Sequence, residues 1–350
     1  MTDFSRRRDA VRRRMAEAGV DSFWIAHPAN VRYLCGFSGS NGIGLLTADA
    51  FYLGTDGRYV TQCDEECVDV ELVVDRDTVR GLAAQALGRV AIEGDHVTVN
   101  QHAIIAERAK TLPVSGWVEG VRVVKDAGEE SFIREACQIS DEALESLLPR
   151  IHVGMTEREI ARALEREMLE RGAEGLAFES IVAGGPHSAI PHHQPTDRPL
   201  ATGDLLKIDF GARVAGYHAD QTRTFVMGAA ADWQSEIHAV VAQAQARGRE
   251  ALSSGVNLKS IDEASRGVIV AAGYADYYPH GLGHGVGLEI HEAPMLGARS
   301  TGILHAGVPV TIEPGIYLPG RGGVRIEDTM WVTESGSESL TRLPRELLAL

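Results

Sequence analysis

The sequence predicts an α+β protein with a smaller N-terminal α/β domain over residues 1–122 and a pseudo-symmetric C-terminal domain over residues 123–350. Three observations lead to this fold class. The chain has 350 residues, which is more than one hydrophobic core usually organises. Strand-like and helical patterns alternate in its first part. Its second part contains the same order of helices and strands twice.

The N-terminal domain begins with a helix predicted over Phe4–Ala18, which Gly19 ends. A second helix is expected over Val79–Leu87. Short apolar runs predict four strands: Phe23–Ala26, Ile43–Leu46, Phe51–Leu53 and Val90–Ile92. This alternation is typical of an α/β sandwich. The sequence of this part contains no recognisable catalytic constellation, and Val121–Gly128 is expected to be the linker.

The first half of the C-terminal domain opens with a long helix predicted over Glu129–Leu148. The next helix starts with a capping box, in which Thr156 caps the helix and Glu159 reaches back to it. This helix is expected to end before Gly172. The segment Leu205–Val226 then predicts two strands joined by a turn.

The second half repeats this order. Helices are predicted over Ala231–Leu252 and Ser260–Ala272, and two strands flank a glycine-rich turn within Val308–Val332. Matching residues stand at constant offsets: Gly203 and Gly307, Asp209 and Glu313, and Gly211 and Gly315 at 104, then Asp220 and Glu327, and Thr222 and Thr329 at 107. A repeat of this size indicates a pseudo-symmetric domain with a site between its halves.

Four acidic residues in the two hairpins are expected to converge. Their predicted pairs are Asp209 with Asp220, if the first hairpin turns between residues 214 and 215, and Glu313 with Glu327, if the second centres on Gly320. Opposite side chains on one face of a sheet lie about 5 Å apart, and like charges there are destabilising. The other face of the second hairpin is apolar, with Val310, Ile312, Ile316, Val324, Ile326 and Met330. The acids therefore belong to a packed sheet.

Converging carboxylates need a counter-charge. Lys207 and Arg325 supply part of it, whereas two divalent cations supply all of it. The alternative is two unrelated, solvated pairs, which the recurrence at a fixed offset disfavours. A bulge in either hairpin would shift the register and separate the acids.

Histidines strengthen the case for a metal site. The stretch HGLGHGVGLEIHE holds His280, His284 and His291 among glycines, which let the backbone approach closely. Oxygen-rich sites with one imidazole suit Mn²⁺ best, with Co²⁺, Zn²⁺ and Fe²⁺ as alternatives. Two metals about 4 Å apart activate a water and polarise a carbonyl or phosphoryl group. The residues thus indicate a hydrolase.

These motifs resemble the pita-bread metallopeptidases, which include methionine aminopeptidases, aminopeptidase P and prolidase. Five residues, within DFG, HADQTRT, GLGHGVGLEIHE, EPG and GVRIEDT, correspond to the metal ligands of the family: Asp209, Asp220, His284, Glu313 and Glu327. The stretch SAIPHHQPTDRPLATGD is similar to that preceding the first ligand in the Xaa-Pro peptidases. NVRYLCGFSGS and LGTDGRYVTQ resemble their additional N-terminal domain.

The resemblance implies two divalent metal ions in each subunit. Asp209 and Asp220 would ligate one of them, and Asp220 and Glu327 would bridge toward the second. His284 and Glu313 would complete the site.

The resemblance also implies roles in catalysis and substrate binding. His192 would stabilise the tetrahedral intermediate, with the neighbouring His193 as the alternative. His291 would hydrogen-bond near the scissile peptide, and Glu313 would shuttle a proton. His280 would line the pocket for the proline side; Arg325 would buffer the carboxylates or bind a substrate carboxylate.

The substrate expected from the resemblance is an Xaa-Pro peptide. Its bond is a tertiary amide and offers no N–H to a protease cleft, so a dedicated enzyme must recognise the ring by shape. A dipeptidase (prolidase) is favoured, and an aminopeptidase P acting on longer peptides is the alternative. Methionine aminopeptidases commonly lack the extra N-terminal domain. A non-catalytic binding protein would be expected to have lost metal ligands.

Composition limits the partners and the location. The formal net charge of −15 disfavours a nucleic-acid partner. No apolar run reaches the roughly 18 residues of a membrane span, and no apolar stretch follows the N-terminal arginines, as a secretory signal would require. The four cysteines are too few for a disulfide framework. We expect reduced thiols, a cytoplasmic protein and, from the resemblance, a homodimer.

Overall fold

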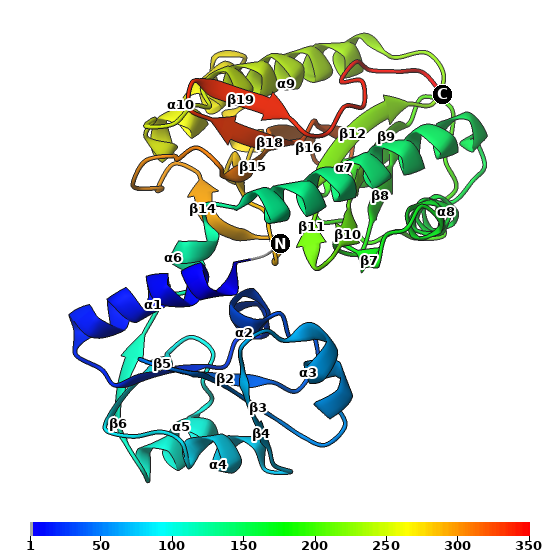
Figure 1. The fold of residues 1–350 in the computed structure, drawn as a ribbon. Coiled ribbons are helices and arrows are strands. Elements are labelled where there is room, and N and C mark those ends of the chain that lie inside the picture. The colour runs from blue at the N-terminus through cyan, green and yellow to red at the C-terminus, as the bar shows by residue number, and fades with distance from the viewer. Residues whose placement is uncertain (1–2) are drawn as a thin grey trace. The chain divides into compact units, whose positions relative to one another are not determined.

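The computed structural model describes residues 3–350, which form two compact units divided between Arg122 and Val123. The first unit contains one mixed six-stranded sheet in the order β4-β3-β2-β1-β5-β6 (Figure 1). Its strands are β1 (Ser22–Ile25), β2 (Ile43–Thr47), β3 (Phe51–Thr55), β4 (Glu71–Val74), β5 (Arg89–Glu93) and β6 (Lys110–Val114). Its helices are α1 (Phe4–Ala18), α2 (Pro28–Cys35), α3 (Val60–Glu66), α4 (Thr78–Ala83), α5 (Val99–Ala106) and α6 (Glu119–Arg122).

The predicted elements of this unit are present, with small differences at their ends. Helix α1 spans the predicted residues, since Gly19 adopts the left-handed conformation (φ 61°) that ends it. Helix α4 ends four residues earlier than expected, and Leu87 is exposed. Strands β4 and β6 and helices α2, α3, α5 and α6 were not predicted. Both strands lie at the sheet edges and are only partly buried, so they lack a continuous apolar run.

The second unit contains the predicted repeat of helices and hairpins. The first half comprises α7 (Ala127–Leu147), α8 (Glu157–Glu170), β7 (Gly175–Leu176), β8 (Ile181–Gly184), β9 (Leu205–Phe210), β10 (Ala212–Val214), β11 (Tyr217–His218) and β12 (Gln221–Val226). The second half comprises α9 (Asp232–Glu250), α10 (Leu258–Ala271), β13 (Gly283–Gly285), β14 (Glu292–Leu296), β15 (Pro309–Ile312), β16 (Gly315–Leu318), β17 (Gly322–Arg325), β18 (Asp328–Thr333) and β19 (Gly336–Ser339). Short 3₁₀ turns lie at Leu148–Arg150 (η1), Gly185–Ala189 (η2) and Ala275–Tyr277 (η3).

Both halves bury their helices against strands, and α9 also packs with β9 and β12 of the first half. In the first, Leu144 of α7 and Leu164 of α8 pack in one cluster with Ile208 and Phe210 of β9. In the second, Ile261 of α10 packs in the same way with strands β15 and β18. Burying one such side chain contributes about 1.5–3 kcal/mol relative to leaving it exposed. The capping box predicted at the start of α8 is present. The two packed halves hold the strand ends that carry the acidic residues.

The register predicted for the first hairpin is wrong. The turn lies at Ala215 and Gly216, both with positive φ (47° and 81°), which is the conformation of a tight hairpin turn that matches the twist of the strands. This moves the turn by one residue and the pairing by two, so Asp209 lies opposite Thr222. Asp220 instead lies just before β12.

The second hairpin has the predicted register. Ile312 pairs with Asp328, and Gly315 pairs with Arg325. These pairs enclose Glu313 and Glu327 and keep them in register. The six apolar residues expected on the other face are all buried. Strands β7, β8, β13, β14 and β19 were not predicted. For β13 the reason is that the glycine-rich stretch around it has no strand periodicity.

Candidate metal centre

Five predicted ligands from both halves meet in one cavity of the second unit. The cavity has a volume of about 390 Å³, and its walls include Asp209, Asp220, His284, Glu313 and Glu327. Asp209 lies on β9 and Asp220 precedes β12, while His284 lies on β13. Glu313 follows β15, and Glu327 precedes β18. Because each group lies on or beside a strand, the sheets determine where the carboxylates meet.

The distances within this group suit metal coordination. His284 Nε2 lies 3.6 Å from Asp220 Oδ2 and 3.6 Å from Glu313 Oε1. One ligand atom each of Asp220, His284 and Glu327 lie within 4.8 Å of one another. His284 Nδ1 is 3.0 Å from the carbonyl of Gly285. This contact assigns the ring proton to Nδ1 and leaves the lone pair of Nε2 directed at the carboxylates.

Burial and mutual repulsion make the group unfavourable without a cation. The pKa of Asp220 and that of Glu313 are raised well above their ordinary values, first by burial and then by neighbouring carboxylates. The pKa of Glu327 is raised to about 8 by burial and by Asp209. Burial, with His291 nearby, lowers the pKa of His284 to about 4, so its ring is neutral as a metal ligand must be.

One oxygen of Asp209 is available to bind a cation. Asp209 Oδ1 is buried and has no hydrogen-bond partner among the described residues, although its other oxygen binds Arg325. A buried acceptor without a partner costs about 1–3 kcal/mol. With oxygen donors, one imidazole and this unpaired oxygen, the residues fit hard or borderline divalent cations.

Arg325 is engaged with the acidic group itself. Its Nε donates to Thr222 Oγ1 (3.0 Å), and Thr222 Oγ1 donates to Glu327 Oε2 (2.7 Å). Its other nitrogens donate to Asp209, to the hydroxyl of Tyr317 (2.9 Å) and to the carbonyl of Pro191 (3.2 Å). Thr222 and Tyr317 were not singled out from the sequence, although the match of Thr222 with Thr329 in the repeat was a usable signal.

The two adjacent histidines have different surroundings. His192 is exposed and lines the cavity. His193 is buried, and its Nε2 lies 2.9 Å from Glu157 Oε2. The ring of His291 lies 4.3 Å from that of His284 in an edge-to-face arrangement.

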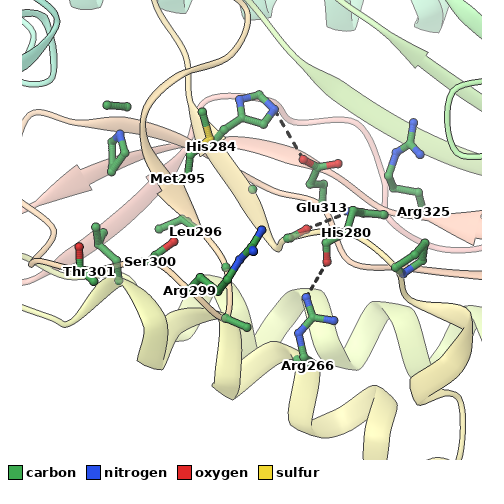
Figure 2. A pocket seen from close by; sticks show the side chains of 18 of the residues that line it. Arg266, His280, His284, Met295, Leu296, Arg299, Ser300, Thr301, Glu313 and Arg325 are labelled. Atoms are coloured by element: carbon green, nitrogen blue, oxygen red, sulfur yellow. Dashed lines mark hydrogen bonds and ion pairs between the residues drawn. The ribbon is translucent and has the colours of Figure 1, made fainter. Parts of the chain in front are cut away.

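His280 lies in a second, adjoining cavity of about 970 Å³ (Figure 2). This cavity shares His192, His284, Glu313 and Arg325 with the first. His280 Nε2 is 2.8 Å from the hydroxyl of Tyr317, and Arg266 donates to the His280 carbonyl (2.6 Å). Arg299, Ser300 and Thr301 line the wall away from the carboxylates. The sequence did not mark these three residues.

Comparisons with known proteins agree with this geometry. Residues 131–334 match Metallopeptidase family M24, and residues 7–124 match the Creatinase/Prolidase N-terminal domain. The chain belongs to metallopeptidase family M24. Its sequence is 37% identical to the Xaa-Pro dipeptidase of Pyrococcus furiosus, over 95% of this chain and 97% of that protein. It is also 37% identical to an uncharacterized peptidase, YqhT, of Bacillus subtilis, over 98% of this chain and 99% of that protein.

Solved structures of the M24 family have the same fold. An Xaa-Pro dipeptidase from Bacillus anthracis superposes with a TM-score of 0.96 at 37% identity, covering 99% of this chain and all of that one. An X-Pro aminopeptidase from Thermotoga maritima superposes with a TM-score of 0.91 at 36% identity, covering 98% of this chain and 99% of that one. The family resemblance and the fold class predicted from the sequence are confirmed: the C-terminal part has the pita-bread fold. The described residues include no helix long and apolar enough to cross a membrane.

A second group in this M24 chain has the residue types of a metal site. It consists of Glu157, His187 and His193, whose ligand atoms lie within 4.8 Å of one another. The Glu157 carboxylate is already occupied, however, because its two oxygens accept hydrogen bonds from five donors. This group was not predicted from the sequence.

Proposed function

We propose that this metallopeptidase is an Xaa-Pro dipeptidase that holds two divalent metal ions with Asp209, Asp220, His284, Glu313 and Glu327. The observation that carries the proposal is the buried cluster of four acids and one neutral imidazole. Relatives named Xaa-Pro dipeptidases support the substrate. When bound, the cations supply Lewis acidity and lower the pKa of a water nucleophile.

We assign the other steps to side chains around the cavity. Glu313, which lines both cavities beside His284, would take a proton from the attacking water and pass it to the leaving nitrogen. His192, exposed at the cavity wall, would donate to the oxyanion of the tetrahedral intermediate. His291 would hydrogen-bond beside the scissile peptide.

The substrate's proline side is assigned to the adjoining cavity. His280 would line it, in contact with Tyr317. Between the two alternatives for Arg325, its hydrogen bonds to Asp209 and Thr222 favour buffering of the carboxylates over binding a substrate carboxylate.

Aminopeptidase P activity is the second candidate. A solved structure named X-Pro aminopeptidase is 36% identical over nearly the whole chain. The adjoining cavity of about 970 Å³ has room for residues beyond a proline.

A paired assay on protein loaded with Mn²⁺ separates dipeptidase from aminopeptidase P activity, with Ala-Pro and Ala-Pro-Ala as substrates. We expect preferential cleavage of Ala-Pro. Preference for Ala-Pro-Ala would favour aminopeptidase P, and cleavage of neither by metal-loaded protein would refute the proline assignment.

Three finer points complete the proposal. Mn²⁺ is the favoured metal because carboxylate oxygens dominate the donor set. A homodimer is proposed from the family resemblance. A reducing, cytoplasmic location is proposed because the four cysteines are free and three of them are buried.

A further inference from the structure

The segment that carries His192 is attached to a single buried carboxylate. Glu157, the first residue of α8, is fully buried. Its Oε1 accepts hydrogen bonds from the Gly184 amide (2.8 Å) and from His187 Nδ1 (2.8 Å). Its Oε2 accepts from the Thr196 amide (2.9 Å), the Thr196 hydroxyl (2.7 Å) and His193 Nε2 (2.9 Å). One side chain thus joins α8, the end of β8 and both ends of segment 187–196.

These hydrogen bonds keep Glu157 charged. Burial alone would raise its pKa, but the Gly184 amide, the Thr196 hydroxyl and amide, and His193 together lower it to about 2. The N-terminus of α8 also favours a negative charge at this position. Both histidines must therefore donate to the carboxylate, which determines their tautomers.

The other side of the segment is held by two basic side chains. Lys207 Nζ, which is fully buried, donates to the carbonyls of Ile190 (2.7 Å) and Pro191 (3.2 Å). Arg325 also donates to the Pro191 carbonyl (3.2 Å). The backbone is thus held immediately before His192, and His193 is held immediately after it. His192 itself makes no hydrogen bond to another described residue, so its position depends on these neighbours.

We propose that Glu157 is a positioning residue for His192: it fixes segment 187–196 so that the imidazole faces the metal cavity. The inference rests on the proposed function, in which His192 stabilises the transition state. Misplacing such a group by about 1 Å lowers the rate on the order of 10²-fold.

Glutamine is a sharp test at this position. Each oxygen of Glu157 accepts from a backbone amide, Gly184 on one side and Thr196 on the other. Neither amide can become an acceptor, so the NH₂ of a glutamine opposes an N–H in both of its orientations. Glu159 is the matched control, because it lies on the same helix and also accepts hydrogen bonds from a threonine. Both the amide and the hydroxyl of Thr156 donate to one of its oxygens, Oε2. Glutamine retains that oxygen.

The experiment is a double-mutant cycle on the metal-loaded full chain with Ala-Pro. We expect Glu157→Gln to lower kcat about 10–100-fold with little change in KM, and Glu159→Gln to stay within about twofold of wild type. In a His192→Ala background, Glu157→Gln should lower kcat by less than about a further threefold, because the imidazole that Glu157 positions is gone. Full additivity of the two losses, or wild-type activity of Glu157→Gln, would refute the inference.

Two further readouts protect the test. Hydrogen–deuterium exchange of peptides covering residues 185–196 should become faster in Glu157→Gln and stay unchanged in Glu159→Gln, whatever the substrate. Metal analysis should give equal contents for Glu157→Gln and wild type; loss of one equivalent would instead make Glu157, His187 and His193 a metal site.

If Glu157→Gln does not fold, Thr196→Val removes one of the five hydrogen bonds and should also lower kcat. Wild-type kcat in a folded Thr196→Val would also refute the inference.

Failure of the proposed function would look different. Wild-type protein would then not cleave Ala-Pro, or His192→Ala would match wild type. The exchange measurement would still report whether Glu157 holds the segment.

Discussion

A single threonine hydroxyl connects the arginine and the acids of the metal cavity. Thr222 Oγ1 accepts from Arg325 Nε and donates to Glu327 Oε2. The hydroxyl has one proton, so its direction toward Glu327 is set by the cation on its other side. This arrangement orients one carboxylate. Groups that orient metal ligands in this way typically change metal affinity by 10–100-fold when they are removed.

The first prediction therefore concerns Thr222→Val. We expect metal affinity to fall by about 10–100-fold, measured by titration with Mn²⁺ and calorimetry, because Glu327 loses its orienting donor. Thr224→Val is the control, since Thr224 lies on the same strand and its hydroxyl bonds to the Arg325 backbone, donating to the carbonyl (2.9 Å) and accepting from the amide (3.2 Å), and not to a carboxylate. Both variants lose a buried hydroxyl. Equal metal affinities in the two would contradict a specific role for Thr222.

At the scale of elements, the position of His284 depends on close backbone approach between strands. Gly283 precedes His284 on β13, and a Cβ at Gly283 would lie 2.0 Å from the carbonyl oxygen of Thr311. The Thr311 hydroxyl also accepts from the His284 amide (3.1 Å). Only glycine therefore lets β13 lie this close to the chain that leads to Glu313. The glycine-rich frame seen in the sequence has here a definite steric reason.

The second prediction is that Gly283→Ala separates His284 from the acids. We expect it to destabilise the protein and to lower metal content, because the strands must move apart to admit the methyl group. Gly267→Ala on α10 is the control. No atom lies within 4 Å of its added Cβ, and alanine in a helix is favoured over glycine by about 1 kcal/mol. Thermal unfolding should show a lower Tm for Gly283→Ala and an equal or higher Tm for Gly267→Ala.

At the scale of the whole molecule, the metal cavity joins the two halves of the repeat. Asp209 and Asp220 come from the first half, whereas His284, Glu313 and Glu327 come from the second. Without cations, the buried acids repel one another, and folding keeps protons on them. Cations that bind only the folded state stabilise it by mass action. Metal binding should therefore stabilise the folded state, in which the two halves are held together.

The third prediction is the pH dependence of the metal-free protein. The pKa of Glu327 is raised to about 8, and those of Asp220 and Glu313 are raised as well. The folded state then binds more protons than the unfolded state. The contribution of these groups to the free energy of unfolding is therefore fully present below the ordinary carboxyl pKa and is lost as pH rises toward 8. After chelation, Tm should decrease from pH 5 to pH 8. Saturating Mn²⁺ should raise Tm most at pH 8, and a metal-free Tm that rises with pH would contradict this account.

Local sequence determined much of this protein. Helix α1 and the start of α8 follow from caps, glycines and apolar spacing, which act over a few residues. The four acidic ligands were visible because the two halves repeat them at nearly constant offsets, and His284 was visible in the glycine-rich histidine stretch. The family followed from the same motifs.

Tertiary structure decided the rest. The turn at Ala215 and Gly216 moved the pairing of Asp209 by two residues, because conformations of similar local energy differ in how they match strand twist. Only the fold distinguishes exposed His192 from buried His193, since the two neighbours have the same local chemistry. Glu157 gains its partners from residues 27–39 positions away. Sequence patterns report periodicity and local caps, whereas contacts over such separations exist only after the chain has packed.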